Sequence, residues 1–275
     1  MIEAASQILR EAAATFILPR YRKLKAQEIS LKAANETVTV ADLAAEAFLT
    51  ARLLDLLPDA RAVGEEAASR NPALLNTLER GTVWLVDPLD GTTNFADGRE
   101  PFAVMVALLR EGETVASWML EAVSGQLAVA ERGAGAFLDG VRVIAPPQAP
   151  AGGKCSGFIA TRFMPDSLRD AIEARKAALG LGGRPSLCAA ADYVALATGK
   201  LDFACYWRSL VWDHAPGSLF LTEAGGIVAR LDGRPYRAAE DGAGLLAARD
   251  RHIWNRICEA VFSGSDLAMS GAGPG

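Results

Sequence analysis

The chain has 275 residues, of which 51% are hydrophobic and 22% are charged, and its formal net charge is −5. This length predicts one large domain or two smaller ones, and the composition is that of a well-packed globular protein, which excludes an intrinsically disordered chain. No block of Lys or Arg supplies the positive charge that phosphate backbones require, so we expect no nucleic-acid partner.

The N-terminal stretch MIEAASQILREAAATFIL has Glu3, Arg10 and Glu11 within its apolar pattern, which indicates an amphipathic helix and not a signal peptide. The longest apolar runs, such as 101–109, are far shorter than the ~20 residues of a membrane span. The four cysteines form no CxxC pair, a pattern typical of reduced thiols in a cytoplasmic protein. We therefore expect a cytoplasmic location without membrane attachment.

Helical spacing in the first half covers 2–24, with Pro19 as a kink or stop, and 41–57, between an N-cap at Thr39 and Pro58. Gly-containing turns separate the later strand-like runs at hairpin intervals, which predicts an antiparallel sheet. The runs are 62–66, 83–87, 102–109, 114–122, 126–132 and 136–140.

The Pro/Gly-rich stretch 145–153 is the natural domain boundary. Strand-like and helical segments alternate after it, which indicates an α/β unit. We therefore predict an N-terminal α+β domain over 1–147, a C-terminal α/β domain over 148–262 and a disordered tail over 263–275. The segments of the second unit are strands at 155–161, 201–207 and 227–233, and helices near 166–179, 190–200, 214–226 and 250–262.

Two acids three positions apart follow the apolar run at 83–86 in the stretch VWLVDPLDGTTNF. The pattern Asp87-Pro-Leu-Asp90-Gly91 suits a solvated turn, because Pro presets φ and Asp and Gly favour turn positions. The alternative is that a cation neutralises the two carboxylates. Gly91 and the hydroxyl residues after it could then form a backbone N–H cradle for phosphate.

Further acids favour the cation. Glu65 and Glu66 end another strand-like run, and Asp213 follows Trp212 at the start of a helix. Carboxylates clustered without Lys or Arg, and without a Cys/His set, suit Mg²⁺ better than zinc. Since Mg²⁺ binds a few carboxylates together with phosphate oxygens and water, the pattern predicts metal-assisted hydrolysis of a phosphate ester.

The segments GEE at 64–66, WLVDPLDGTTNF at 84–95 and WDHAPG at 212–217 with its downstream EAGG resemble the inositol monophosphatase family of magnesium-dependent, lithium-sensitive phosphatases. The likeness spans roughly 30–230. It implies a layered α-β-α-β-α sandwich, a homodimer, two or three Mg²⁺ ions and a small phosphate monoester substrate.

The resemblance also implies residue roles. Glu65, Asp87, Asp90, Asp213 and the Leu89 carbonyl would hold metal. Glu65 and Thr92 would orient the attacking water, Asp42 would support the Thr92 hydroxyl, and Lys32 would lie on a loop near the weakest metal. Substrate would contact Asp90, Gly91, Thr92, Ala189 and Tyr206. Asp42 could equally serve the first turn of its helix, Lys32 could be a surface charge, and Glu66 could be a solvated neighbour.

Departures from the family pattern concern the alcohol part of the substrate. Tyr206 stands where inositol-specific members have a Glu that contacts substrate hydroxyls, and Leu187-Cys188 replaces Gly and a hydroxyl residue. Tyr206, Trp207 and Arg208 could favour another alcohol or a second anionic group, or could be core residues. His214, beside Asp213, could be a proton relay, although the family mechanism does not need one.

The expected function is hydrolysis of inositol-1-phosphate or a similar ester by metal-activated water attack. Histidinol phosphate, a sugar phosphate or a phosphoadenosine nucleotide are alternative substrates with the same chemistry. A third hypothesis is a regulatory protein that acts through partner binding.

Overall fold

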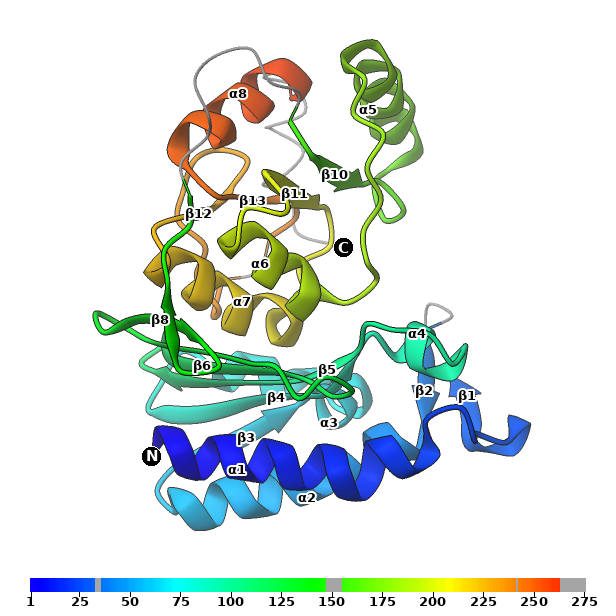
Figure 1. Cartoon of the computed structure of the whole chain (residues 1–275), viewed down its shortest axis with the longest axis vertical. Helices are drawn as coiled ribbons and strands as arrows, with labels where there is room; N and C mark the ends of the chain where they lie inside the picture. Colours follow the sequence, from blue (N-terminus) through cyan, green and yellow to red (C-terminus); the bar gives the residue numbers. More distant parts are fainter. Residues whose placement is uncertain (33–35, 147–154, 241, 263–275) are drawn as a thin grey trace.

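The computed structural model describes residues 1–32, 36–146, 155–240 and 242–262. Five layers of alternating helix and sheet stack along the longest axis (Figure 1). Helices α1 (Ile2–Ala12) and α2 (Val40–Leu56) form one outer layer, and α5 (Asp166–Leu179) and α8 (Arg251–Val261) form the other. The α-β-α-β-α sandwich predicted from the sequence is confirmed.

A seven-stranded sheet lies next to α1 and α2. Its first two strands are parallel and every other neighbouring pair is antiparallel, as the hairpin-like spacing of the sequence predicted. The strands, in spatial and chain order, are β3 (Arg61–Gly64), β4 (Thr82–Asp90), β5 (Ala103–Arg110), β6 (Glu113–Glu121), β7 (Leu127–Glu131), β8 (Gly135–Leu138) and β9 (Val141–Val143).

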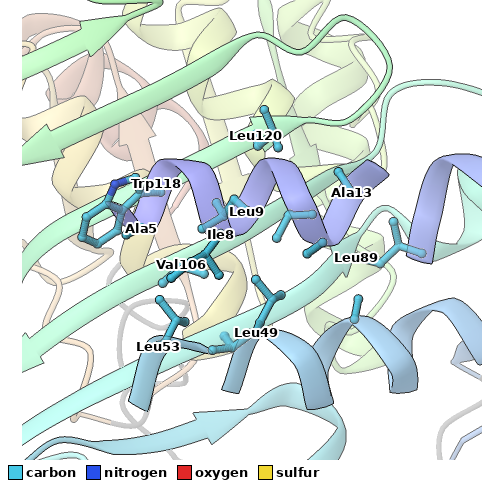
Figure 2. Packing of buried hydrophobic residues seen from close by; sticks show 14 of the residues in the cluster. Ala5, Ile8, Leu9, Ala13, Leu49, Leu53, Leu89, Val106, Trp118 and Leu120 are labelled. Atoms are coloured by element: carbon cyan, nitrogen blue, oxygen red, sulfur yellow. The ribbon is translucent and has the colours of Figure 1, made fainter. Parts of the chain in front are cut away.

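The core beneath α1 and α2 follows from two periodicities. Leu9 of α1 and Leu49 and Leu53 of α2 recur at helical spacing, and all three are fully buried against one face of the sheet (Figure 2). Val106 of β5 and Trp118 of β6 meet them, because alternate strand residues point to the same face. The opposite face of the sheet is left for the middle helical layer.

The middle layer consists of α6 (Ala189–Ala197) and α7 (Val211–Glu223), which lie between the large sheet and a four-stranded sheet (Figure 1). In the small sheet only the first pair of strands is parallel. Its order is β10 (Gly157–Ala160), β11 (Phe203–Tyr206), β13 (Leu245–Ala248) and β12 (Ile227–Arg230). Among the described residues, no helix is long and apolar enough to span a bilayer.

Several element boundaries differ from the sequence prediction. The N-terminal helix continues as a π-helical turn over Ala13–Ile17 and a 3-10 turn over Leu18–Arg20, so it ends before residue 24. The run predicted as a strand over 62–66 ends at Gly64, and α3 (Glu65–Arg70) begins there. The prediction missed the short strands β9 and β13, and also the hairpin of β1 (Ile29–Leu31) and β2 (Thr37–Thr39). The predicted tail and most of the predicted linker lie outside the described residues.

Candidate active site

The end of β4 directs two carboxylates into the interior. The pairing of β4 with β5 loses its register between Asp87 and Asp90, where Pro88 lies, and Gly91 then takes a left-handed φ of +84°. Asp87 and Asp90 are only 1% and 8% exposed, which excludes a solvated turn. The turn at Pro88 and Gly91 therefore also places both acids in the interior.

Gly91 is required by this geometry. A Cβ atom there would lie 3.0 Å from the Pro101 carbonyl oxygen and 3.2 Å from the Leu187 carbonyl oxygen, both of which belong to the backbone. The positive φ alone disfavours any other residue. Helix α4 (Thr92–Ala96) starts immediately afterwards, so Gly91 sets the direction of the turn that leads from the acids to Thr92.

Four of the acidic side chains that line one cavity of about 280 Å³ come from three elements. Glu65 comes from the first turn of α3, Asp87 and Asp90 from the end of β4, and Asp213 from the first turn of α7. The structure therefore brings together all the carboxylates that the family resemblance implies as ligands, with Leu89 in the same lining. Elements from both halves of the chain are needed to assemble them.

Burial and neighbouring carboxylates disfavour the ionisation of Asp87 and Asp213. Burial raises the pKa of Asp87 well above its usual range, and the charges of Glu65, Asp90 and Asp213 raise it further. Burial likewise raises the pKa of Asp213 well above its usual range, with further contributions from Asp90 and Glu65. A donor set made up only of oxygen atoms is suited to a hard divalent cation.

Lys32 pairs with two glutamates at the site. Its Nζ lies 2.7 Å from Oε1 of Glu65 and 2.6 Å from Oε1 of Glu66, and its side chain is 11% exposed. Burial alone would lower the pKa of Lys32, but the two glutamates outweigh it and raise that pKa. The pKa of Glu65 is nevertheless raised, because burial outweighs the lysine. Lys32 is therefore a largely enclosed counter-ion and not a surface charge, and its partner Glu66 is buried.

Asp90 already has partners in the second half of the chain. Its Oδ1 accepts the Ala189 N–H at 3.0 Å, and its Oδ2 accepts the Ala190 N–H at 2.8 Å. The Cys188 thiol donates to the same Oδ2 at 3.1 Å. The N-terminus of α6 therefore contacts Asp90 directly, and Ala189, predicted as a substrate contact, lies at the site through its backbone N–H.

The carboxylates are not arranged around a common centre as they stand. Within the described ranges, no group of three or more His, Cys, Asp or Glu side chains is spaced to hold a metal ion. Glu65 and Asp90 both have other partners, namely Lys32 and α6. The chemistry of the donors fits Mg²⁺, but binding it would require Glu65 to exchange Lys32 for the ion.

Asp42 connects the site to α2. Its Oδ2 accepts the Thr39 N–H at 2.9 Å and the Thr39 hydroxyl at 2.6 Å, which completes a capping box at the start of α2. The Thr92 hydroxyl lies 3.1 Å from the other oxygen, Oδ1, and 2.8 Å from the Leu89 carbonyl oxygen. The two interpretations of Asp42 are therefore compatible, because one oxygen serves the helix and the other faces Thr92.

A second buried glutamate supports the first turn of α3. The Glu66 N–H donates to Oε2 of Glu46 at 2.6 Å, and the Ala67 N–H donates to Oε1 at 2.9 Å. Burial raises the pKa of Glu46 to about 7, with a smaller increase from Glu66. Glu46 thus positions the backbone that presents Glu65.

Tyr206 lies in the cavity wall, but its hydroxyl donates to Oδ2 of Asp192 at 3.1 Å. Trp207 belongs to the apolar cluster between the small sheet and α8, and the charge of Arg208 is balanced by an ion pair with Glu36. His214 is buried, and burial lowers its pKa to about 3, so the ring stays neutral and does not suit a proton relay at neutral pH.

Sequence reasoning missed Glu46, Asp192 and Cys188. Asp192 had a detectable signal, since it is the single charged residue in the helix AAADYVALA. Glu46 had a weaker one, because it falls on the apolar stripe of α2 with Ala45 and Leu49. Cys188 was noted only as a replacement for a hydroxyl residue, and its bond to Asp90 depends on contact between distant segments.

The comparisons place this fold and site in a known class. Residues 1–263 match the profile of the inositol monophosphatase family, so the chain belongs to this family of phosphatases. The inositol-1-monophosphatase of Bacillus subtilis is 27% identical over 252 residues, covering 91% of this chain and 92% of the relative. The Nus factor SuhB of Escherichia coli is 30% identical, covering 85% of this chain and 86% of the relative.

Solved structures show the same fold. The Thermotoga maritima IMPase superposes with a TM-score of 0.80 at 22% identity, covering 97% of each chain. The extragenic suppressor protein SuhB of Bartonella henselae gives a TM-score of 0.80 at 25% identity, covering 96% of this chain and 98% of the other. The layered sandwich is therefore shared over nearly the whole length of the chain.

Proposed function

We propose that the chain is a Mg²⁺-dependent phosphomonoesterase that hydrolyses inositol-1-phosphate or a similar small monoester. One observation carries this proposal: Glu65, Asp87, Asp90 and Asp213 line a single cavity, burial raises the pKa values of all four, and neighbouring carboxylates raise those of Asp87 and Asp213 further. A chain without a cation ligand has no physical reason to keep such a destabilising set.

The four carboxylates and the Leu89 carbonyl would hold two or three Mg²⁺ ions. Bound Mg²⁺ would supply positive charge to the phosphate oxygens and a water of lowered pKa. Support for the assignment comes from the all-oxygen donor set and from Lys32, which pairs a positive charge with Glu65 and Glu66.

The residues of the chain would position and deprotonate the nucleophile. Glu65 would accept the proton of the attacking water, which Thr92 would orient. Asp42 accepts a hydrogen bond from the Thr92 hydroxyl and so fixes the direction of the hydroxyl lone pairs. The backbone N–H groups of Gly91 and Thr92 would donate to the phosphate oxygens. We propose direct in-line attack by water, without a phosphoenzyme.

Inositol-1-phosphate is the first candidate substrate because curated relatives at 27–34% identity carry the name inositol-1-monophosphatase. Tyr206, in place of the family Glu, supports testing other alcohols with the same chemistry. These are histidinol phosphate, a sugar phosphate and a phosphoadenosine nucleotide. We further propose lithium sensitivity, a homodimer and a cytoplasmic location, with no nucleic-acid or membrane partner.

A regulatory role through partner binding is a second candidate, favoured by the relative named Nus factor SuhB. The buried carboxylate cluster disfavours this as the sole role, since partner binding does not require four acids in one cavity.

The test is a panel of phosphate monoesters assayed with Mg²⁺, with and without Li⁺. We expect Asp90→Asn and Asp213→Asn to lower kcat/KM on the best substrate by a factor on the order of 10³, because each removes a charged ligand. Asp139→Asn is the matched control, since Asp139 is exposed and accepts the Leu127 N–H far from the cavity. Near-normal turnover in both site variants would refute the metal assignment.

A further inference from the structure

Two further acidic side chains line the cavity without belonging to the proposed ligand set: Glu36, which is paired with Arg208, and Asp192. Asp192 lies in the first turn of α6, is 3% exposed and shares the cavity lining with Asp90 and Tyr206. Because the N–H groups of Ala189 and Ala190 at the start of α6 bond to Asp90, Asp192 lies within one helical turn of the residues that contact the acid cluster.

The carboxylate of Asp192 has unused acceptor capacity. Its Oδ2 accepts the Tyr206 hydroxyl at 3.1 Å, and its Oδ1 accepts the Ser186 N–H at 3.3 Å. Within residues 1–32, 36–146, 155–240 and 242–262, no Lys or Arg forms an ion pair with it. A carboxylate can accept about four hydrogen bonds, so part of its capacity remains for a donor in the cavity.

Tyr206 is held too firmly to adapt to a substrate. Its ring lies edge-on to Phe158 with the centroids 5.5 Å apart, is stacked with Tyr193 at 6.3 Å, and packs on His214 at 4.6 Å. Three aromatic neighbours fix the direction of its hydroxyl, which points to Asp192. The family resemblance implied that Tyr206 itself contacts the substrate, whereas the geometry of the Tyr206 side chain suits the positioning of Asp192.

We propose that Asp192, oriented by Tyr206, accepts a hydrogen bond from a hydroxyl group on the alcohol part of the substrate. This rests on the proposed phosphomonoesterase function and makes the favoured substrate class the phosphate esters of polyols. The acidic acceptor that is missing at position 206 is then supplied by the neighbouring helix, and the Tyr206 hydroxyl directs it.

A purely structural role would be to hold the loop at Ser186. That loop has other attachments: the Ser186 hydroxyl donates to the Cys188 carbonyl at 2.8 Å, and Nδ2 of Asn94 donates to the Ser186 carbonyl at 2.9 Å. Because these bonds do not involve Asp192, the loop does not depend on its carboxylate. A buried acceptor that faces a cavity also discriminates strongly against ligands that lack the matching donor.

The experiment compares myo-inositol 1-phosphate with cyclohexyl phosphate, which has the same ring without hydroxyl groups. We expect Asp192→Asn to lower the ratio of kcat/KM for the polyol ester to kcat/KM for the cyclohexyl ester by about tenfold, because a hydrogen bond of roughly 1.5 kcal/mol to the Asp192 carboxyl group is lost. The loss should fall mainly on KM. Tyr206→Phe should change the ratio in the same direction by a smaller factor, and Asp139→Asn should leave it unchanged.

The outcomes separate this inference from the function on which it rests. Wild-type protein that hydrolyses neither ester with Mg²⁺ would overturn both. Wild-type protein that hydrolyses the polyol ester, with an unchanged ratio in Asp192→Asn, would overturn only the role of Asp192. An equal loss on both esters in a variant with wild-type melting temperature would assign Asp192 to the phosphate end of the site, which also overturns the proposal.

Discussion

Replacement of Lys32 by methionine tests whether this lysine is the counter-ion of the metal-free site. Lys32 makes ion pairs of 2.7 and 2.6 Å with Glu65 and Glu66, and the three side chains are 11%, 15% and 3% exposed. Removing one partner from a buried ion pair costs about 3–5 kcal/mol, since the remaining charge stays desolvated. We take the lower end, about 3 kcal/mol, because Glu65 retains some contact with solvent.

The assay is urea unfolding of Lys32→Met in EDTA and in saturating Mg²⁺. In EDTA we expect the free energy of unfolding to fall by about 3 kcal/mol, or roughly 6–12 °C in Tm for a chain of this size. The apparent Kd for Mg²⁺ should fall by roughly tenfold, because the ion no longer competes with the ammonium group for Glu65.

The Lys32 contribution should not vary between pH 6 and 9. Its pKa is raised in the folded state, so the stabilisation is complete below the unfolded pKa of 10.5 and is lost only as pH rises through the higher folded value. Lys23→Met, at an exposed lysine, is the matched control. Equal stability and equal Mg²⁺ affinity in the two variants would refute the counter-ion role.

Four further outcomes follow from the site. Asp87→Asn should raise the Tm of the metal-free protein, because it removes a buried repulsive charge, while abolishing stabilisation by Mg²⁺ in thermal unfolding; a lower Tm in EDTA would contradict this. The pKa of Glu46 is about 7 in the folded state against 4.5 in the unfolded state, so the folded state binds more protons between these values and the free energy of unfolding falls as pH rises. Glu46→Gln should remove this fall, which is on the order of 3 kcal/mol in EDTA. An unchanged pH profile would refute the pKa assignment. Gly91→Ala should cost at least about 1–2 kcal/mol, from the positive φ, and lower kcat; wild-type kinetics would show that the turn adapts. Tyr206→Glu places a second carboxylate beside Asp192. If position 206 reaches the substrate, kcat/KM for inositol-1-phosphate should rise. An unchanged or lower value assigns the substrate contact to Asp192.

The sequence predicted elements well where local chemistry decides the boundary. The expected helix at 41–57 is observed at Val40–Leu56, because Thr39 and Asp42 form the capping box and Pro58 follows its end. The prediction missed β9, which has only three residues, and β13, which pairs with the distant strands β11 and β12.

In the candidate site, too, some residues could be selected from the sequence, but their contacts could not. The acids that end strands or open helices could be selected from the sequence, and the family resemblance implied their grouping in one site. Their partners could not be selected in this way, since the contacts of Lys32 with Glu66 and of Cys188 with Asp90 join segments 34 and 98 residues apart. Such contacts depend on how the layers stack, which periodicity does not encode.

The bonds from α6 to Asp90 have a consequence for dissection of the chain. Asp90 belongs to the segment before residue 147, and the N–H groups that bind it belong to the segment after 154. Asp213 also comes from the later segment, so neither piece alone contains the full set of carboxylates. A cut between the two segments would therefore separate Asp90 and Asp87 from Asp213, and the complete set of carboxylates exists only where both segments are packed together.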